Sequence, residues 1–395
     1  MKIFRLITIL FVTQLFLLLL GSTTYAMDIT TREDLKLDNT LSEDESLFTQ
    51  PQKVYITQVK SLNKELKNDS RAWIRSIYYY SITRLKLNDI PYNYLVDSSG
   101  NVFEGTRGGA GANPGLQGGD NVVLIGILDS DSTLTPRAQS SLVELVETLS
   151  YKYGIKEGSW DFVDLQIAMN EGERSYLTYT SSSSSVSQTI TQTMSSVRWS
   201  AEEHLEYKAS IVDVEYPKEI EVGKQLPVKV TIKNENDFTW FSDTKYIYIS
   251  TADSSESPYA INSAWESFSR PTYIKEKYVK PGDSVEVQFN MLGKSKPGEY
   301  KEEFIFVKDT ASQFKDSNFE VTFNIIAGDK KLVQVVSPQY GFVNIRECRW
   351  YSCAKIEIAN DGDVFIMNKK EEGWYEIYYN EENLGWVSQI YMKEL

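Results

Sequence analysis

Imidazole and thiol groups, which most often bind zinc or act as bases and nucleophiles, are scarce in this sequence. The chain of 395 residues contains one His, His204, and two Cys, Cys348 and Cys353. Zinc needs about three protein ligands of this kind beside an open position, and a Ser, Thr or Cys nucleophile needs a base. Before His204 no His or Cys occurs at all. The first half of the chain therefore lacks the residues for a conventional zinc site or a nucleophile paired with His.

The first 26 residues have the pattern of a secretory signal. Lys2 and Arg5 precede an apolar run, Leu6–Leu20, and Thr24-Tyr25-Ala26 ends in small residues suited to cleavage. An uncleaved N-terminal anchor is the alternative, although the run is short for a membrane span. No other stretch could cross a membrane. We therefore predict a secreted or cell-envelope protein with no transmembrane segment after signal cleavage.

Export would place the two cysteines, which stand close together near the C-terminus, in an oxidising environment. Paired cysteines in a small exported domain usually form a bridge. A zinc site is the rival, but two thiolates without a local His fall short of four ligands. We predict a disulfide between Cys348 and Cys353.

The net charge of the chain argues against some classes of binding partner. The chain carries a formal net charge of −14. Nucleic acids and anionic membrane surfaces attract Lys and Arg, so an acidic chain does not suit them. We expect no nucleic-acid partner.

The elements that would position a site lie between Lys53 and Tyr153. Strands are predicted at Lys53–Val59 and, because the run is apolar on both faces, at Val122–Leu128. Apolar residues at helical spacing predict a helix over Arg71–Leu85, and a second follows the Thr135-Pro136 start and ends at Gly154. Between them, Tyr94-Leu95-Val96, a turn ending at Gly100, and Asn101-Val102-Phe103 predict a hairpin.

The hairpin sequence, Asp89-Ile90-Pro91-Tyr92-Asn93-Tyr94-Leu95-Val96 followed by Gly100-Asn101-Val102-Phe103-Glu104-Gly105, is specific. It resembles the core of zinc N-acetylmuramoyl-L-alanine amidases and peptidoglycan recognition proteins. Asn121–Ile127 is similar to a later strand of that family, and the resemblance covers roughly residues 50–155. It implies an α/β domain with a central mixed sheet and flanking helices. Chance similarity of hairpins is the alternative.

The resemblance also implies where zinc would be bound. The family's first zinc His lies on the first strand, where this chain has Thr57 and Gln58. A Tyr-His or Trp-His near the end of the first helix corresponds to Tyr78-Tyr79-Tyr80, which we interpret as core and rim aromatics. The second His and third ligand would fall in Ile155–Glu171, which holds neither His nor Cys. Carboxylates remain at Glu104, Asp161 and Asp164, but no spacing predicts a cluster. We predict that no zinc or other cofactor is bound.

Four residues are the predicted substrate-binding set: Tyr92, Asn93, Arg107 and Asn113. The resemblance places Tyr92 at the family's active-site Tyr, which assists the zinc-bound water and the oxyanion. Without zinc it is a vestige, and a hairpin aromatic packed at the cleft is the alternative. Asn113 lies near the family's G-A-H and is a candidate groove residue.

The composition divides the chain into successive parts. Residues 27–52 are polar and acidic and are predicted to be a flexible leader, residues 53–176 form the degenerate amidase-like domain, and residues 177–206 are a Ser/Thr-rich linker. Residues 207–327 contain short alternating strands separated by turn signals, which predicts a β-sandwich. Motifs such as Asn234–Trp240 and Pro297–Tyr300 resemble immunoglobulin-like domains, and Trp240 is expected in the core.

Residues 331–395 contain four further motifs: Phe342–Arg346, Gly362–Ile366, Glu372–Ile377 and Leu384–Tyr391. They resemble the bacterial Src-homology-3-like (SH3-like) domains of cell-wall proteins, which are small β-barrels. Trp374 and Trp386 are expected in the barrel core, and Tyr351, Tyr375 and Tyr391 are candidate wall-binding residues.

Three functions fit this multidomain organisation. The first is a secreted, catalytically silent amidase homologue that binds peptidoglycan, its stem peptides, or another wall or surface protein. The second is an active N-acetylmuramoyl-L-alanine amidase with atypical metal ligands. The third is a structural surface protein without a glycan ligand. Zinc content separates the second from the others, and wall binding separates the first from the third.

Overall fold

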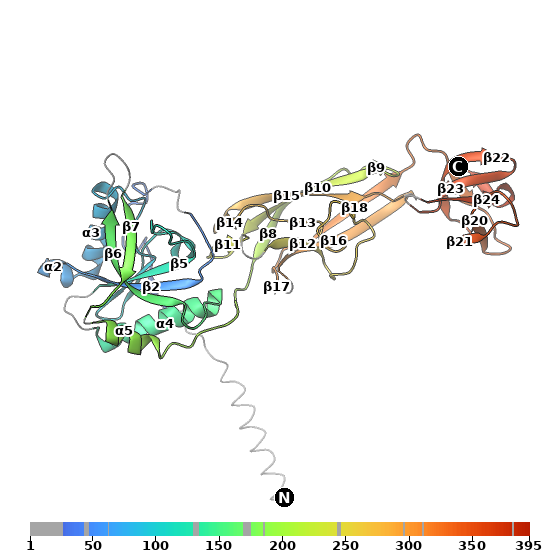
Figure 1. Ribbon diagram of the computed structural model, residues 1–395. Coiled ribbons are helices and arrows are strands. Elements are labelled where there is room, and N and C mark those ends of the chain that lie inside the picture. Colours follow the sequence, from blue (N-terminus) through green and yellow to red (C-terminus); the bar gives the residue numbers. More distant parts are fainter. Residues whose placement is uncertain are drawn as a thin grey trace, which may run out of the picture. The chain divides into compact units, whose positions relative to one another are not determined.

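A computed structural model describes residues 27–42, 47–61, 63–128, 134–168, 175–184, 186–242, 246–294, 297–309, 312–380 and 383–395 (Figure 1). The chain divides into two compact units. One comprises residues up to Leu47 and Pro51–His204, and the other comprises Phe48–Gln50 and Leu205–Leu395. The predicted signal, residues 1–26, lies outside the described residues.

A mixed seven-stranded sheet organises the first unit, as predicted. In spatial order its strands are β1 (Ile29–Thr30), β4 (Val102–Glu104), β3 (Tyr94–Asp97), β5 (Val122–Leu128), β2 (Lys53–Val59), β6 (Trp160–Ala168) and β7 (Tyr176–Ser181). Every residue of β5 is buried, and β5 pairs in parallel with β2 and β3. The sequence therefore correctly predicted a central strand covered on both sides.

The predicted hairpin is β3–β4. Gly100 takes a φ of 85°, which favours glycine, and the Asp97 carboxylate accepts hydrogen bonds from the backbone N–H groups of Ser99 and Asn101, both at 2.9 Å. These bonds fix the turn, and the turn fixes the register of the strands around Tyr92.

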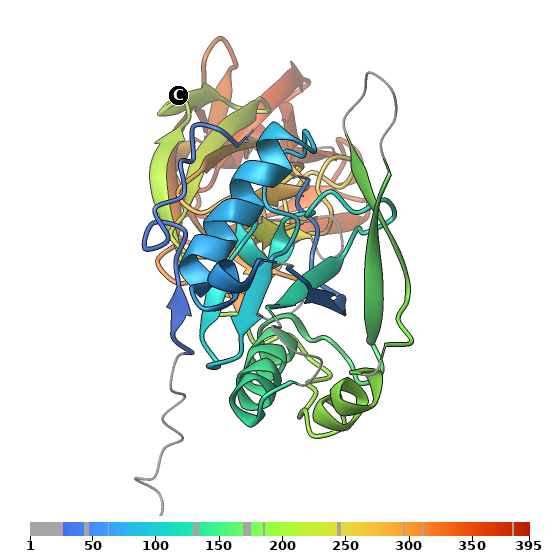
Figure 2. The same cartoon turned by 90° about the vertical axis from the view of Figure 1, so that its left-hand side faces the viewer.

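Both predicted helices are present. α3 (Ser70–Thr83) is capped by the Asp69 carboxylate and packs through Trp73, Ile74 and Tyr78 against the sheet. α4 (Pro136–Tyr153) has the predicted Thr135 cap and ends at Gly154, whose φ is 68°. A short helix, α2 (Lys64–Lys67), precedes α3, and Figure 2 looks onto α3.

The prediction of a flexible leader at residues 27–52 is wrong for the part that the structure describes. β1 pairs in parallel with β4, with Ile29 opposite Val102. Leu35 and Leu37 are buried in the same cluster as the inner face of α3. The segment lacks periodicity because its few apolar residues enter the core singly, so the sequence pattern could not reveal their burial.

The prediction of a linker at residues 177–206 is also wrong. This segment contains most of β7, which pairs with β6, and the helix α5 (Ser187–Met194), which packs beside α4 (Figure 2). Four apolar residues at helical spacing are buried: Val186, Ile190, Met194 and Val197. Abundant Ser and Thr concealed this apolar face, and the first unit extends to His204.

The second unit begins with a β-sandwich. One sheet contains β15 (Ser284–Leu292), β10 (Gln225–Asn234) and β8 (Ala209–Glu215). The other contains β13 (Thr272–Tyr273), β12 (Ile247–Thr251), β16 (Gly298–Lys308), β18 (Phe319–Ile326) and β9 (Glu219–Glu221), with β17 (Ser312–Gln313) paired to β16. β11 (Trp240–Phe241) pairs with β14 (Tyr278–Val279). Side chains of both sheets share one core, and Trp240 is fully buried in it, as expected.

The remainder of the second unit is a seven-stranded sheet around a small core. Its spatial order is β21 (Lys355–Asn360), β20 (Phe342–Arg346), β24 (Leu384–Ser388), β23 (Trp374–Tyr378), β22 (Val364–Glu371), β19 (Leu332–Val335) and β25 (Met392–Glu394). The predicted disulfide joins Cys348 and Cys353, whose Cα atoms are 5.7 Å apart. Leu332 and Ile366 also pack into the sandwich core, so the two parts share apolar contacts.

Candidate functional site

Tyr92, just before β3, is held over the sheet by its neighbours. Its ring packs against two apolar clusters, one beneath α3 and one over β5 and β6, and it lies against the backbone of Gly126. Burial raises the pKa of Tyr92 to about 12. The hydroxyl is protonated at neutral pH, as in an ordinary tyrosine, and burial moves its ionisation still further from that range.

Asn93 is fully buried and does not line a groove, which corrects its prediction as a substrate contact. Its Nδ2 donates to the carbonyl oxygens of Gly109 and Ala112, each at 2.7 Å, and its Oδ1 accepts from the Leu124 N–H at 2.7 Å. The side chain joins the central strand to the loop after β4, which contains the turn η1 (Gly109–Gly111). The side-chain amide has a structural role.

The start of this loop is bound closely to the segment before β3. Thr106 donates its hydroxyl to the Ile90 carbonyl oxygen at 2.7 Å, and its N–H donates to the Tyr92 carbonyl oxygen at 2.6 Å. The N–H of Arg107 donates to Asp89 Oδ2 at 2.8 Å. A Cβ atom at Gly105 would lie 2.0 Å from the Tyr92 carbonyl oxygen, so only glycine fits there. These bonds and this close contact tie residues 89–92 to residues 105–107. We call these two joined segments the frame.

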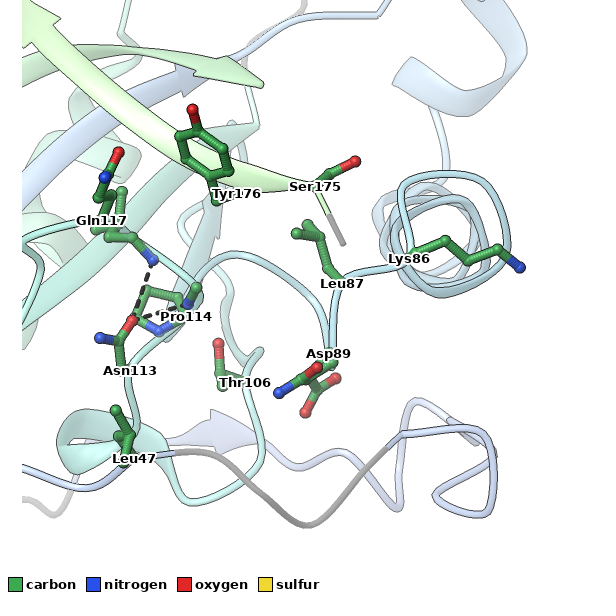
Figure 3. A pocket seen from close by; sticks show the side chains of 13 residues that line it. Leu47, Lys86, Leu87, Asp89, Thr106, Asn113, Pro114, Gln117, Ser175 and Tyr176 are labelled. Atoms are coloured by element: carbon green, nitrogen blue, oxygen red, sulfur yellow. Dashed lines mark hydrogen bonds between the residues drawn. The ribbon is translucent and has the colours of Figure 1, made fainter. Parts of the chain in front are cut away.

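A pocket of about 430 Å³ lies beside this frame (Figure 3). Its walls come from the end of the segment that connects α3 to β3, from the loop after β4, and from the start of β7. The lining residues are Leu47, Lys86, Leu87, Asn88, Asp89, Thr106, Asn113, Pro114, Gly115, Leu116, Gln117, Ser175 and Tyr176. Ligand pockets typically fall in this size range and combine apolar walls with a few polar groups.

Of the four predicted substrate-binding residues, this lining includes Asn113 but not Tyr92, Asn93 or Arg107. Asn113 Oδ1 accepts the N–H groups of Gly115 and Leu116 at 2.8 and 3.0 Å, so the residue also shapes the wall (Figure 3). Arg107 is half-buried, and its Nη2 donates to the Asn39 carbonyl oxygen at 3.4 Å.

Sequence reasoning missed most of the pocket. Lys86–Asp89 stand directly before Ile90, so their closeness to the hairpin motif was a usable signal. Ser175 and Tyr176 were missed because the rest of β7, from residue 177 on, was interpreted as a linker, so no strand was predicted there. Their contribution depends on the pairing of β7 with β6, where Ala168 lies opposite Tyr176.

The region where the resemblance implies zinc has side chains of a different kind. Thr57 is buried on β2, opposite Gly126 of β5. Within the segment that would carry the later ligands, residues 160–168 form β6, and Tyr179 of the adjoining β7 packs on Tyr55 with ring centres 4.5 Å apart. Lys53 and Asp161 form an ion pair at 2.7 Å beside them. These side chains do not fit a zinc site.

The chain's His and Cys side chains are engaged elsewhere. His204 stacks on Tyr151 at the end of α4, with ring centres 4.2 Å apart, and the two cysteines form the disulfide. In the part of the chain that the structure describes, no three His, Cys, Asp or Glu side chains lie close enough to hold a metal ion.

The candidate wall-binding tyrosines of the last domain differ in exposure. Tyr351 is 63% exposed, packs on Trp374 with the rings tilted and their centres 4.9 Å apart, and bonds through its hydroxyl to Ser388 Oγ at 3.0 Å. Tyr391 is half-buried. Tyr375 is 2% exposed and donates its hydroxyl to Glu394 at 2.7 Å, so its prediction as a surface contact is wrong. Trp374 and Trp386 are buried.

Comparison with known proteins finds likeness in structure alone. No protein-family model matches the chain, and no curated protein matches it. Drosophila PGRP-SD, a peptidoglycan recognition protein, is 18% identical, with 35% of this chain and 82% of that chain covered and a TM-score of 0.29. PGRP-Hd from Alvinella pompejana is 14% identical, with 38% and 90% covered and a TM-score of 0.30.

Human PGRP-IBETAC, solved in complex with glycosamyl muramyl pentapeptide, is 19% identical, with 34% of this chain and 81% of that chain covered and a TM-score of 0.29. These structural neighbours are peptidoglycan recognition proteins, and each likeness covers little more than a third of this chain.

Among the residues that the structure describes, no helix combines the length and apolar character needed to span a bilayer.

Proposed function

We propose that the first unit binds peptidoglycan through its stem peptide and does not cleave it. Two observations together support this proposal. The hairpin motif builds a rigid frame beside a pocket of about 430 Å³, while the sequence has no His or Cys before His204. A retained frame without zinc donors favours recognition over hydrolysis.

The pocket's chemistry suits a short peptide. Leu47, Leu87 and Pro114 offer apolar contact for alanyl and other aliphatic groups. Asn113, Gln117 and Tyr176 offer amide and hydroxyl groups that can pair with peptide amides and carboxylates. Figure 3 shows these polar side chains on one side of the pocket and Leu87 on another.

Hydrolysis of an unactivated amide has further requirements. It needs an activated water or nucleophile and a stabilised oxyanion. The Tyr92 hydroxyl, like that of an ordinary tyrosine, is protonated at neutral pH, and burial raises its pKa further, to about 12, so it offers hydrogen bonds but no base for activating water. A carboxylate-bound metal is the remaining route to activity, and this is the alternative that the experiment must test.

The rest of the chain extends this proposal. Cleavage of the signal after Ala26 would release the protein to the cell envelope. The last domain, with its resemblance to wall-binding SH3-like domains, would add a second wall contact through the exposed Tyr351. The immunoglobulin-like sandwich would serve as a spacer or a protein-binding module.

Mature protein should be incubated with purified peptidoglycan, with and without excess zinc. We expect the protein to sediment with the wall and to release no new N-terminal alanine groups. Chelator-sensitive release above a buffer control would establish the active amidase instead. Absence of sedimentation, together with no binding of soluble muramyl peptides, would favour the structural surface protein.

A further inference from the structure

Arg32, in the segment that the sequence predicted to be flexible, is buried against the frame of the pocket. Its Nη1 lies 3.1 Å from Asp89 Oδ1, and the two side chains are only 6% and 4% exposed. The same nitrogen donates to the Gly105 carbonyl oxygen. Nε and Nη2 donate to Asn39 Oδ1 at 3.3 and 3.2 Å. The guanidinium thus joins its own segment to two parts of the frame.

The partner of Arg32 joins two walls of the pocket. Asp89 Oδ1 also accepts the Ile90 N–H at 2.7 Å, and Oδ2 accepts the Arg107 N–H at 2.8 Å. Asp89 itself lines the pocket, as does Thr106, which precedes Arg107 (Figure 3). One carboxylate therefore sets the separation of the wall before β3 from the wall after β4.

A carboxylate buried in this way depends on its cation. Removing one partner of a buried ion pair leaves the other charge buried without its counter-charge. The Asp89 carboxylate would then reorient toward solvent or admit water, and both N–H bonds to it would weaken. The guanidinium has a second role, because its other N–H groups donate hydrogen bonds to Asn39 Oδ1 and the Gly105 carbonyl oxygen. A lysine ammonium cannot reproduce this planar set of bonds.

We propose that Arg32 is a positioning residue for the pocket. It holds Asp89, and through Asp89 it fixes the spacing of the two walls. Residues 27–42 are consequently part of the binding domain and not a dispensable leader. The inference rests on the proposed function for its ligand, while the effect on the walls is independent of any ligand.

The test compares Arg32→Met and Arg32→Lys with Arg71→Met in the full mature chain. Arg71 is a matched control because its exposed Nη1 also contacts the N-terminal segment, at the Asp34 carbonyl oxygen at 3.1 Å, and takes no part in the bonds described above for Asp89. Two quantities are measured at a temperature where each variant is folded. They are the affinity for a soluble muramyl stem-peptide fragment and the amide hydrogen exchange of Ile90 and Arg107.

We expect Arg32→Met to weaken binding about tenfold or more. Hydrogen exchange at both amides should accelerate by a similar factor. Arg32→Lys should fall between Arg32→Met and the unmodified protein, and Arg71→Met should stay within about twofold of it.

Unchanged affinity and exchange in Arg32→Met would overturn the proposal. Equal acceleration of exchange throughout the sheet would also overturn it, because that result reflects general stability. If the unmodified protein binds no fragment, the proposed function fails. The exchange at Ile90 and Arg107 still decides the role of Arg32.

Discussion

The ring of Tyr92 lies directly against Gly126 of the central strand. A Cβ atom at Gly126 would come within 3.0 Å of Tyr92 Cδ1 and 2.9 Å of Val59 Cγ2. The absent side chain therefore provides the space in which Tyr92 sits between its two apolar clusters.

Gly126→Ala should destabilise the first unit by about 1–3 kcal/mol, because an extra methyl group in a packed core forces side chains or backbone to shift. Hydrogen exchange of the β5 amides measures this in the full protein. Adding Val59→Ala removes the nearest atom, so the double variant should lose less than the sum of the single effects. Strict additivity of the two changes would contradict this account of the contact.

Asn93→Asp should be more damaging than Asn93→Ala. The aspartate would place a second acceptor against the carbonyl oxygens of Gly109 and Ala112, where the amide now donates. We expect a loss of roughly 3 kcal/mol or more, above the typical cost of an unsatisfied buried group. Urea unfolding followed in the first unit measures it, and Asn113→Asp is the control at a half-exposed position. Similar losses for Asn93→Asp and Asn113→Asp would argue against a buried structural role for Asn93.

Glu104 should make the stability of the first unit depend on pH. Burial, the largest effect, raises the pKa of Glu104, while the N–H and charge of Arg32 act in the opposite direction. A carboxyl whose pKa is raised in the folded state holds its proton more tightly there. Its stabilising contribution is therefore present below the unfolded pKa and is lost as pH rises through the folded pKa.

Glu104→Gln removes this titration while keeping an acceptor for the Arg32 N–H. Relative to the unmodified protein, the variant should gain stability as pH rises from about 4 to 7. Unfolding midpoints across this range test the expectation. Glu144→Gln, at an exposed position of α4, should show no such trend. A gain for Glu104→Gln that shrinks with rising pH would show that the sign is wrong.

The α5 segment should resist proteolysis until its apolar face is disrupted. Ile190 is 1% exposed, so Ile190→Asp would bury a charge or detach the helix from α4. Limited proteolysis of this variant should give early cuts near residues 186–197. Gln192→Asp, on the exposed side of the same helix, should be cut as slowly as the unmodified protein. Rapid cutting of the unmodified protein within α5 would restore the linker interpretation.

The sequence was informative where a local pattern determines structure. β5 was predictable from an unbroken apolar run, and α4 from its Thr135 cap and terminal Gly154. The β3–β4 hairpin was predictable because turn chemistry and alternation coincide within a few residues. These elements correspond to the frame around Tyr92.

The sequence was uninformative where burial depends on a distant partner. Arg32 and Asp89 are 57 residues apart, and nothing local to Arg32 indicates its burial. Asn93 was predicted to bind substrate, yet its side chain is bonded to three backbone groups from elsewhere in the domain. The wall of Ser175 and Tyr176 likewise required the pairing of two strands.

The parallel pairing of β1 with β4 constrains the order in which the domain can assemble. Ile29 leaves the ribosome first, yet its partner Val102 follows only after β2, α3 and β3. Chains emerge from the N-terminus, and contacts between distant residues form late because a long loop must close. The edge strand next to the predicted cleavage site thus stays unpaired during much of synthesis. If the proposed signal is cleaved, the signal peptidase would act beside this strand, and pairing with β4 together with the insertion of Arg32 then brings residues 29–32 into the folded unit.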